Sequence, residues 1–229
     1  MTMTRHTSST YENELNRLRD RLITMGERAE AQLREAMQAV IEHDAARAAR
    51  VVEGDDLIDR DEVEIDDLAQ RILATRQPVA SDLRSITMAL KLVTDLERIG
   101  DLAANIAKRA QELMRLTPAD WPVDFDPLAR QVEQNLHEAL ESFAERDVAR
   151  AAKVIEADRE VDRLNSDLFN TLIQDLAAEQ TVGVLVLPLT SIARALERIG
   201  DHAKNLAEEV VYMVRGRDVR HRDITTTPL

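Results

Sequence analysis

Apolar residues recur every three or four positions along most of the chain, which is the spacing of one face of an α-helix. The first such seam consists of Leu15, Leu18, Leu22, Met25, Ala29, Leu33, Ala36 and Val40. Asp44 follows as a candidate N-cap of a second helix, because its carboxylate can accept from the free N–H groups of a first turn. That helix is expected to end at Gln77, since the residue before a proline is pushed out of the α region, and a third helix follows. Its apolar seam, and the seam that repeats it later in the chain, consist of Ala89, Leu92, Leu96, Ile99, Ala103, Ile106, Ala110 and Leu113, and of Leu189, Ile192, Leu196, Ile199, Ala203, Leu206, Val210 and Met213. The pattern therefore predicts three long helices before residue 117.

The second half of the chain repeats this pattern. Residues 33–37 correspond to 136–140, and the sequence Leu-Glu-Arg-Ile-Gly-Asp occurs at both 96–101 and 196–201. Asp147 takes the place of Asp44 as an N-cap candidate. Internal repetition of this kind is typical of two copies of one structural unit. We therefore expect an all-α fold of six long helices, arranged as two tandem antiparallel three-helix bundles.

Breaks in the helical pattern indicate the domain boundaries. The segment between the copies carries three of the six prolines, which is typical of a linker, and the two ends of the chain are polar and rich in Thr or Arg. We predict a mobile tail at 1–10, a first repeat at 11–117, a linker at 118–126, a second repeat at 127–215 and a mobile tail at 216–229.

Composition supports the all-α class and excludes several functions. The 229 residues include only 3% aromatic residues, six Gly and six Pro, which are too few strand and turn formers for a sheet protein. The net charge of −13 opposes binding to nucleic acid. The absence of Cys excludes disulfides, thiolate zinc sites and thiol catalysis. The longest apolar run, 181–189, falls far short of the roughly 20 residues that cross a bilayer, so we expect a cytoplasmic protein without direct membrane insertion.

Acidic residues interrupt the apolar stripes of the second and third helix in both copies. Each occurs as a pair four residues apart, and like charges at this spacing repel by about 0.2–0.5 kcal/mol per pair. Something is expected to offset that repulsion at every position where both copies keep the acids. These positions are Asp55, Asp59, Glu97 and Asp101 in the first copy, and Asp158, Asp162, Glu197 and Asp201 in the second.

A group of four carboxylates forms in each copy if its second and third helices lie side by side. Such a group would hold protons at neutral pH unless cations neutralised it. Oxygen-only ligands suit divalent ions such as magnesium, manganese or iron, and four negative charges balance two of them. The acid pairs therefore predict a metal cluster in each repeat.

The alternative is a solvated acidic face. Arg60, Arg98, Arg159 and Arg198 would then be salt-bridge partners, worth about 0–1 kcal/mol each. Gly100 and Gly200 lie in the middle of the predicted third helices, where glycine costs about 1 kcal/mol relative to alanine. A neighbouring helix that comes close beside the acids would explain both glycines, as would tight packing alone.

Other chemistries find little support in the sequence. His202 adjoins Asp201 and is a possible nitrogen ligand, but the first copy has Leu102 at that position. No Glu-x-x-His occurs, so the ligand set of ferritin-like di-iron bundles is missing. No Gly-rich phosphate loop is present either. We therefore predict no catalytic residues.

The two Leu-Glu-Arg-Ile-Gly-Asp motifs closely resemble those of the PhoU family of bacterial phosphate-transport accessory regulators. Residues 78–84 are similar to the family's turn into the third helix, and the acid pairs of the second helices are similar to its own. The resemblance covers residues 11–215; residues 181–188 depart from the family's turn pattern and instead form an apolar segment that is a candidate interface.

This resemblance implies two bundles related by a pseudo-twofold axis, a homodimer, and magnesium, manganese, iron or zinc at the eight acids. It also implies function by contact. Such proteins act as adaptors between the phosphate transporter ATPase subunit and a membrane sensor histidine kinase, and repress the phosphate-starvation response when phosphate is plentiful.

Two other functions stay open at this point. Divalent ions held by carboxylates can also clamp an in-line displacement, so a dinuclear metallohydrolase acting on phosphate esters is the alternative. A purely structural acidic bundle is the third possibility, and it predicts that the acid pairs can be lost without consequence.

Overall fold

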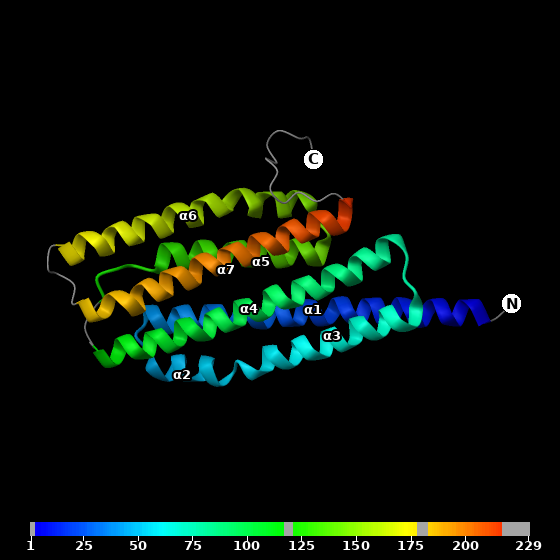
Figure 1. Cartoon of the computed structure of the whole chain (residues 1–229), viewed down its shortest axis with the longest axis horizontal. Coiled ribbons are helices and arrows are strands. Elements are labelled where there is room, and N and C mark those ends of the chain that lie inside the picture. The colour runs from blue at the N-terminus through cyan, green and yellow to red at the C-terminus, as the bar shows by residue number, and fades with distance from the viewer. Residues whose placement is uncertain (1–2, 117–120, 178–182, 217–229) are drawn as a thin grey trace.

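The computed structural model describes residues 3–116, 121–177 and 183–216, with the backbone alone at 3–8 and 80. All regular structure in these ranges is helical, so the predicted all-α class is confirmed. The helices run nearly along the long axis of a rod-shaped molecule (Figure 1). They are α1 (Met3–Ile41), α2 (Ala45–Glu53), α3 (Asp56–Arg76), α4 (Ala80–Leu116), α5 (Asp126–Glu145), α6 (Val148–Ala177) and α7 (Gly183–Arg215).

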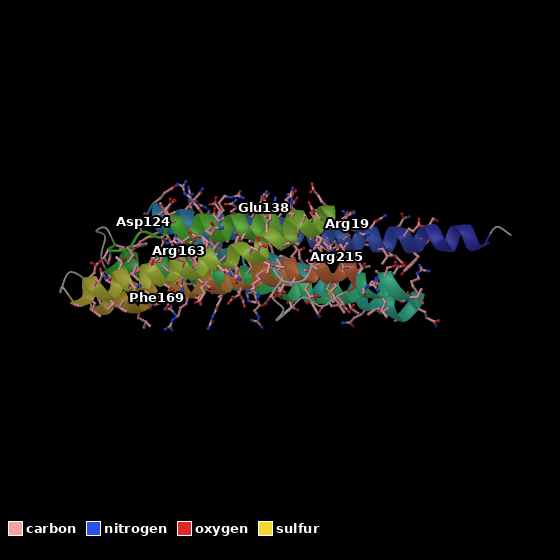
Figure 2. The ribbon with its side chains drawn as sticks, turned by 90° about the horizontal axis from the view of Figure 1, so that it is seen from above. Arg19, Asp124, Glu138, Arg163, Phe169 and Arg215 are labelled. Atoms are coloured by element: carbon pink, nitrogen blue, oxygen red, sulfur yellow. The ribbon has the colours of Figure 1, made fainter. Side chains whose placement is uncertain are left out.

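The helices form the two predicted three-helix bundles, side by side. The first contains α1, the α2–α3 pair and α4; the second contains α5, α6 and α7 (Figure 1). The third helices of the two bundles, α4 and α7, pack against each other along the middle of the rod, and α1 also packs against α5. Charged side chains such as Glu138 and Arg163 cover the outside of the rod (Figure 2). The tandem arrangement expected from the repeat is therefore confirmed.

The second helix of the first repeat differs from the prediction, because it is interrupted between α2 and α3. The amide of Gly54 donates to the carbonyls of Arg50 at 3.0 Å and Val51 at 3.3 Å, and ends α2. The second repeat has Ala157 at this place, and α6 runs through it without a break. Glycine costs a helix interior about 1 kcal/mol relative to alanine, which favours the break in the first repeat alone. The chain thus has seven helical segments in the described ranges where six were predicted.

The predicted seams form the core. In α4 every seam position is buried, and in α1 and α7 only the terminal positions, Leu15 and Met213, remain partly exposed. Both predicted N-caps are present: Asp44 Oδ1 accepts from the amide of Arg47 at 2.9 Å, and Asp147 Oδ1 from that of Ala149 at 2.8 Å. Local sequence signals therefore set the helix starts as well as the buried faces.

The predicted boundaries are met only in part. Helix α1 begins at Met3, so the segment predicted as an N-terminal tail is mostly helical. In the linker, Val123 and Phe125 are buried against the bundle, and the Trp121 ring lies 4.3 Å from that of His43. Residues 117–120, the turn at 178–182 and the predicted tail from 217 onward lie outside the described residues. None of the helices in the described ranges is both long and apolar enough to cross a bilayer.

Candidate functional site

The predicted acids lie at the places where α3 crosses α4 and, in the second repeat, where α6 crosses α7. A Cβ added at Gly100 would lie 2.8 Å from Ile58 Cδ1, and one at Gly200 would lie 3.0 Å from Val161 Cγ1. Only a residue without a side chain allows the helices to come this close. The acids flank these contact residues in sequence, so each crossing brings its two pairs toward each other. The close approach expected from the two glycines is thus confirmed.

The acids of the first repeat repel one another electrostatically. The pKa of Asp59 is raised, first by burial and then by the charges of Asp55 and Asp101. Burial and the charges of Asp101, Glu62 and Asp59 raise the pKa of Glu97. All four acids predicted for this repeat therefore belong to one electrostatically coupled group, which we call the repeat-one acid group.

Few compensating charges reach this group. The Arg98 guanidinium lies 3.5 Å from Glu97 Oε2 and 3.4 Å from Asp101 Oδ2, but 57% of its side chain is exposed, so solvent screens these contacts. From α1, the Gln32 amide donates to Asp55 Oδ1 at 3.0 Å and to the carbonyl of Gly100 at 3.5 Å. The Gln32 amide is uncharged, so its hydrogen bonds leave the negative charge of the group in place.

The second repeat contains its own cation. Asp158 is only 6% exposed, and its Oδ2 accepts from Lys204 Nζ at 2.5 Å. The pKa of Asp201 is raised by burial and by Asp158 and Asp162, and lowered in part by Lys204. We call Asp158, Asp162 and Asp201 the repeat-two acid group, and Lys204 lies within it. Glu197, the fourth predicted ligand, lies half-buried on α7 but is not among the groups that shift the pKa of Asp201.

His202 does not complete this group. Its Nδ1 lies 2.8 Å from Asp95 Oδ1 on α4, so the imidazole joins the two bundles instead. The pair connects the central helices of the rod.

The carboxylates suit a divalent cation by donor type but are not already gathered around one. In the part of the chain that the structure describes, no three His, Asp or Glu side chains are placed to hold a single metal ion. Asp59 and Asp101 are exposed, so both carboxylates have room to turn toward a cation at the α3–α4 crossing. The metal clusters therefore stay a prediction.

The repeat architecture and its motifs correspond to a known family. The sequence model of the PhoU domain matches residues 22–110 and again residues 125–210, one match in each bundle. This chain belongs to the PhoU family. The resemblance drawn from the duplicated motifs is thereby confirmed.

PhoU proteins of several bacteria match nearly the whole chain. The phosphate-specific transport system accessory protein PhoU homolog of Pseudomonas aeruginosa is 41% identical, over 97% of this chain and 93% of that protein. The corresponding PhoU of Escherichia coli K12 is 35% identical, over 96% of this chain and 92% of that protein. The crystal structure of the P. aeruginosa PhoU has a TM-score of 0.87 at 40% identity, covering 90% of this chain and 100% of that one. PhoU from Streptococcus pneumoniae, at 24% identity and a TM-score of 0.83, shares the fold.

Three polar residues at the PhoU crossings were not predicted as part of the acid groups. Glu62 has a raised pKa from burial and from the charges of Asp66 and Asp59, but Asn165 replaces it in the second repeat, so repetition did not select it. Gln32 comes from a different helix, and nothing in its sequence context links it to Asp55. Lys204 could have been found from the sequence, because it is one of the few differences between the two motifs: the first copy has Ala104 at the equivalent position.

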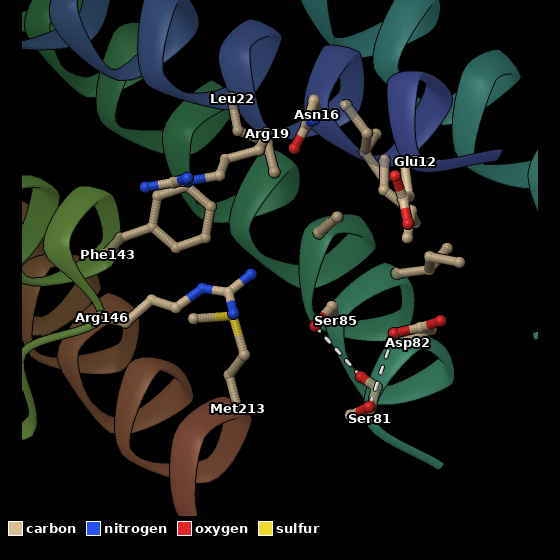
Figure 3. Close-up of a pocket in the computed structure, with 14 residues that line it drawn as sticks. Glu12, Asn16, Arg19, Leu22, Ser81, Asp82, Ser85, Phe143, Arg146 and Met213 are labelled. Carbon is tan, nitrogen blue, oxygen red and sulfur yellow. Dashed lines mark hydrogen bonds between the residues drawn. The ribbon is translucent and has the colours of Figure 1, made fainter. Parts of the chain in front are cut away.

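Apart from the acid groups, the structure has a cavity between the two PhoU repeats. A cavity of about 380 Å³ opens among α1, α4, α7 and the end of α5 (Figure 3). Arg19 and Arg146 reach into it on either side of Phe143 (Figure 3). Ser85 Oγ donates to the Ser81 carbonyl at 3.1 Å, and the carboxylates of Glu12 and Asp82 line the same cavity.

Proposed function

We propose that this PhoU-family protein is a metal-binding, non-enzymatic regulator of phosphate uptake and of phosphate-starvation signalling. The observation that carries the proposal is its similarity to phosphate-specific transport system accessory proteins over 96–97% of the chain, with both repeats matched. It acts in the cytoplasm as an adaptor between the phosphate transporter ATPase subunit and a sensor histidine kinase, and represses the starvation response when phosphate is plentiful. A rod built from two bundles of the same plan is well suited to simultaneous contact with two partners.

We propose that the acids of the two crossings bind the metal. Asp55, Asp59, Glu97 and Asp101 are the ligands offered by the first repeat, and Asp158, Asp162, Glu197 and Asp201 those offered by the second. Magnesium, manganese, iron and zinc are the candidate ions. A bound dication supplies positive charge that offsets the mutual repulsion of the carboxylates. The raised pKa values of Asp59 and Glu97 support a cation in the first repeat, because Arg98, the cation beside Glu97, is 57% exposed and does not offset the effects of burial and of the neighbouring acids.

Complementation of a strain that lacks the gene tests the regulatory function. We expect the wild-type protein to restore repression of a phosphate-starvation reporter, such as secreted alkaline phosphatase, in phosphate-rich medium. A Glu97→Gln/Asp101→Asn variant should lose the metal of the first repeat and also repression, while it keeps its helical circular dichroism spectrum. The control is Asp20→Asn/Glu27→Gln, which also removes two negative charges, but from exposed positions of α1. Unchanged repression by the first variant would contradict a role for the acid group in signalling.

Two further measurements address partners and reaction. Pull-down of the ATPase subunit and of the cytoplasmic part of the kinase tests the adaptor function, and analytical ultracentrifugation tests the homodimer. The metallohydrolase alternative predicts that protein loaded with Mg²⁺ or Mn²⁺ hydrolyses para-nitrophenyl phosphate. We expect no turnover; hydrolysis that disappears in Glu97→Gln/Asp101→Asn would overturn the non-enzymatic function.

A further inference from the structure

The two repeats provide an internal comparison at the acid groups. Their motifs from residue 96 to 105 and from 196 to 205 differ at only two positions, where Leu102 and Ala104 are replaced by His202 and Lys204. His202 pairs with Asp95 on the other bundle, so Lys204 is the one difference that reaches the acid group.

Lys204 places a positive charge inside the repeat-two acid group. Its Nζ lies 2.5 Å from Asp158 Oδ2, on a carboxylate whose side chain is only 8% exposed. The corresponding carboxylate of the first repeat, Asp55, accepts from the neutral amide of Gln32 instead, at 3.0 Å. The position equivalent to Lys204 is there the buried methyl group of Ala104. The buried carboxylate of the second repeat is thus neutralised by the chain itself, whereas in the first repeat the only cation described beside the acids is the exposed Arg98.

We propose that Lys204 is a built-in cation that takes the place of a metal in the second repeat, so that this protein binds divalent metal in the first repeat alone. The inference narrows the proposed function from the acids of both repeats to those of the first, and it depends on metal binding at the repeat-one acid group. A dication at the second crossing would have to displace the ammonium from Asp158 and would then lie a few ångströms from a like charge, which is unfavourable beside a carboxylate that is only 8% exposed. The cation at the first crossing is Arg98, which contacts Glu97 and Asp101 but has 57% of its side chain exposed, so it can swing into solvent when a dication binds.

This asymmetry has a consequence for regulation. The α6–α7 contact carries its own counter-ion and is independent of the metal supply. The α3–α4 contact depends on an ion from outside. A change in metal occupancy therefore acts on one bundle of the rod and leaves the other unchanged.

Exchange of the two residues between the repeats tests the inference. Bound Mn²⁺ per chain is measured by equilibrium dialysis with electron paramagnetic resonance of the free ion, for wild type, Lys204→Ala, Asp158→Asn, Ala104→Lys and Lys204→Ala/Asp158→Asn. We expect Lys204→Ala to bind about twice as much Mn²⁺ as wild type, and the added Asp158→Asn to remove the gain. Ala104→Lys should weaken the wild-type site by about tenfold or more. Lys153→Ala, an exposed position of α6, is the charge-matched control and should bind as wild type does.

The outcomes separate the inference from the function on which it depends. If Asp158→Asn binds only half as much Mn²⁺ as wild type, the role of Lys204 is overturned and metal binding stays intact. The same conclusion follows if Lys204→Ala binds no more Mn²⁺ than wild type. Absence of bound Mn²⁺ from every variant would overturn the metal function itself and the inference with it. Circular dichroism of each variant is recorded beforehand to show that it folds. Because Ala104 is buried, Ala104→Ser and Ala104→Met serve as uncharged controls for crowding. If the charge of the lysine is what weakens Mn²⁺ binding in Ala104→Lys, then Ala104→Met should bind Mn²⁺ near the wild-type level.

Discussion

Gly100→Ala tests the close approach of α3 and α4 that brings the acids together. Two effects oppose each other at this position. Alanine in place of a glycine inside a helix stabilises the helix by about 1 kcal/mol. The added Cβ, however, would lie 2.8 Å from Ile58 Cδ1 and 3.3 Å from its Cγ2, and Ile58 is only 2% exposed. Overpacking of a filled core costs about 1–3 kcal/mol.

The balance predicts that Gly100→Ala lowers the free energy of unfolding by up to about 2 kcal/mol. The sharper prediction concerns its coupling with Ile58→Val, which deletes Cδ1 and with it the 2.8 Å contact. Ile58→Val alone should cost about 0.5–1.5 kcal/mol. In that background Gly100→Ala should be better tolerated by about 1 kcal/mol or more, because the helix propensity gain remains and most of the clash is gone.

Gly200→Ala is the matched case in the second repeat. Its Cβ would lie 3.0 Å from Val161 Cγ1, and a β-branched side chain in a helix has little freedom to turn away. Urea unfolding followed by far-ultraviolet circular dichroism, in the presence of a chelator, measures all of these variants. If Gly100→Ala raises the unfolding midpoint and Ile58→Val leaves that gain unchanged, the two helices do not touch at this point and the geometry of the acid group is wrong.

Three further predictions follow from the same contacts. Asp147→Ala removes the cap of α6 and should cost about 1 kcal/mol in urea unfolding, while Asp147→Ser should retain most of the stability. Lys91→Ala leaves the carboxylate of Glu209, of which only 9% is exposed, without its partner at 3.0 Å; the expected loss is about 1–2 kcal/mol, and Glu209→Gln should restore part of it. Glu97 has a pKa raised first by burial and then by Asp101, so its ionisation destabilises the folded state. Without metal, Glu97→Gln should therefore be more stable than wild type at neutral pH, and this advantage should disappear as the pH falls below the ordinary glutamate value. An advantage that grows on acidification would contradict the direction of the shift.

Local signals in the sequence account for much of the fold. The seams of α1, α4 and α7 were predictable because a residue's place on a helix depends only on its spacing from its neighbours. The caps at Asp44 and Asp147 were predictable for the same reason, since a cap is completed within three residues. The break after Gly54 was missed, because glycine inside a helical pattern lowers stability without fixing where, or whether, the helix is interrupted.

The candidate site divides in the same way. Repetition of the acid pairs, and of the glycine between Ile and Asp, selected the residues at both crossings from the sequence alone. The partner of each charged group was decided by tertiary structure: Lys204 reaches Asp158 on another helix, His202 turns to Asp95 on the other bundle, and Gln32 joins Asp55 from α1. Helix spacing determines which face a side chain occupies, whereas its partner depends on how two helices are rotated and shifted against each other. That alignment results from packing over their whole length, and no short stretch of sequence specifies it.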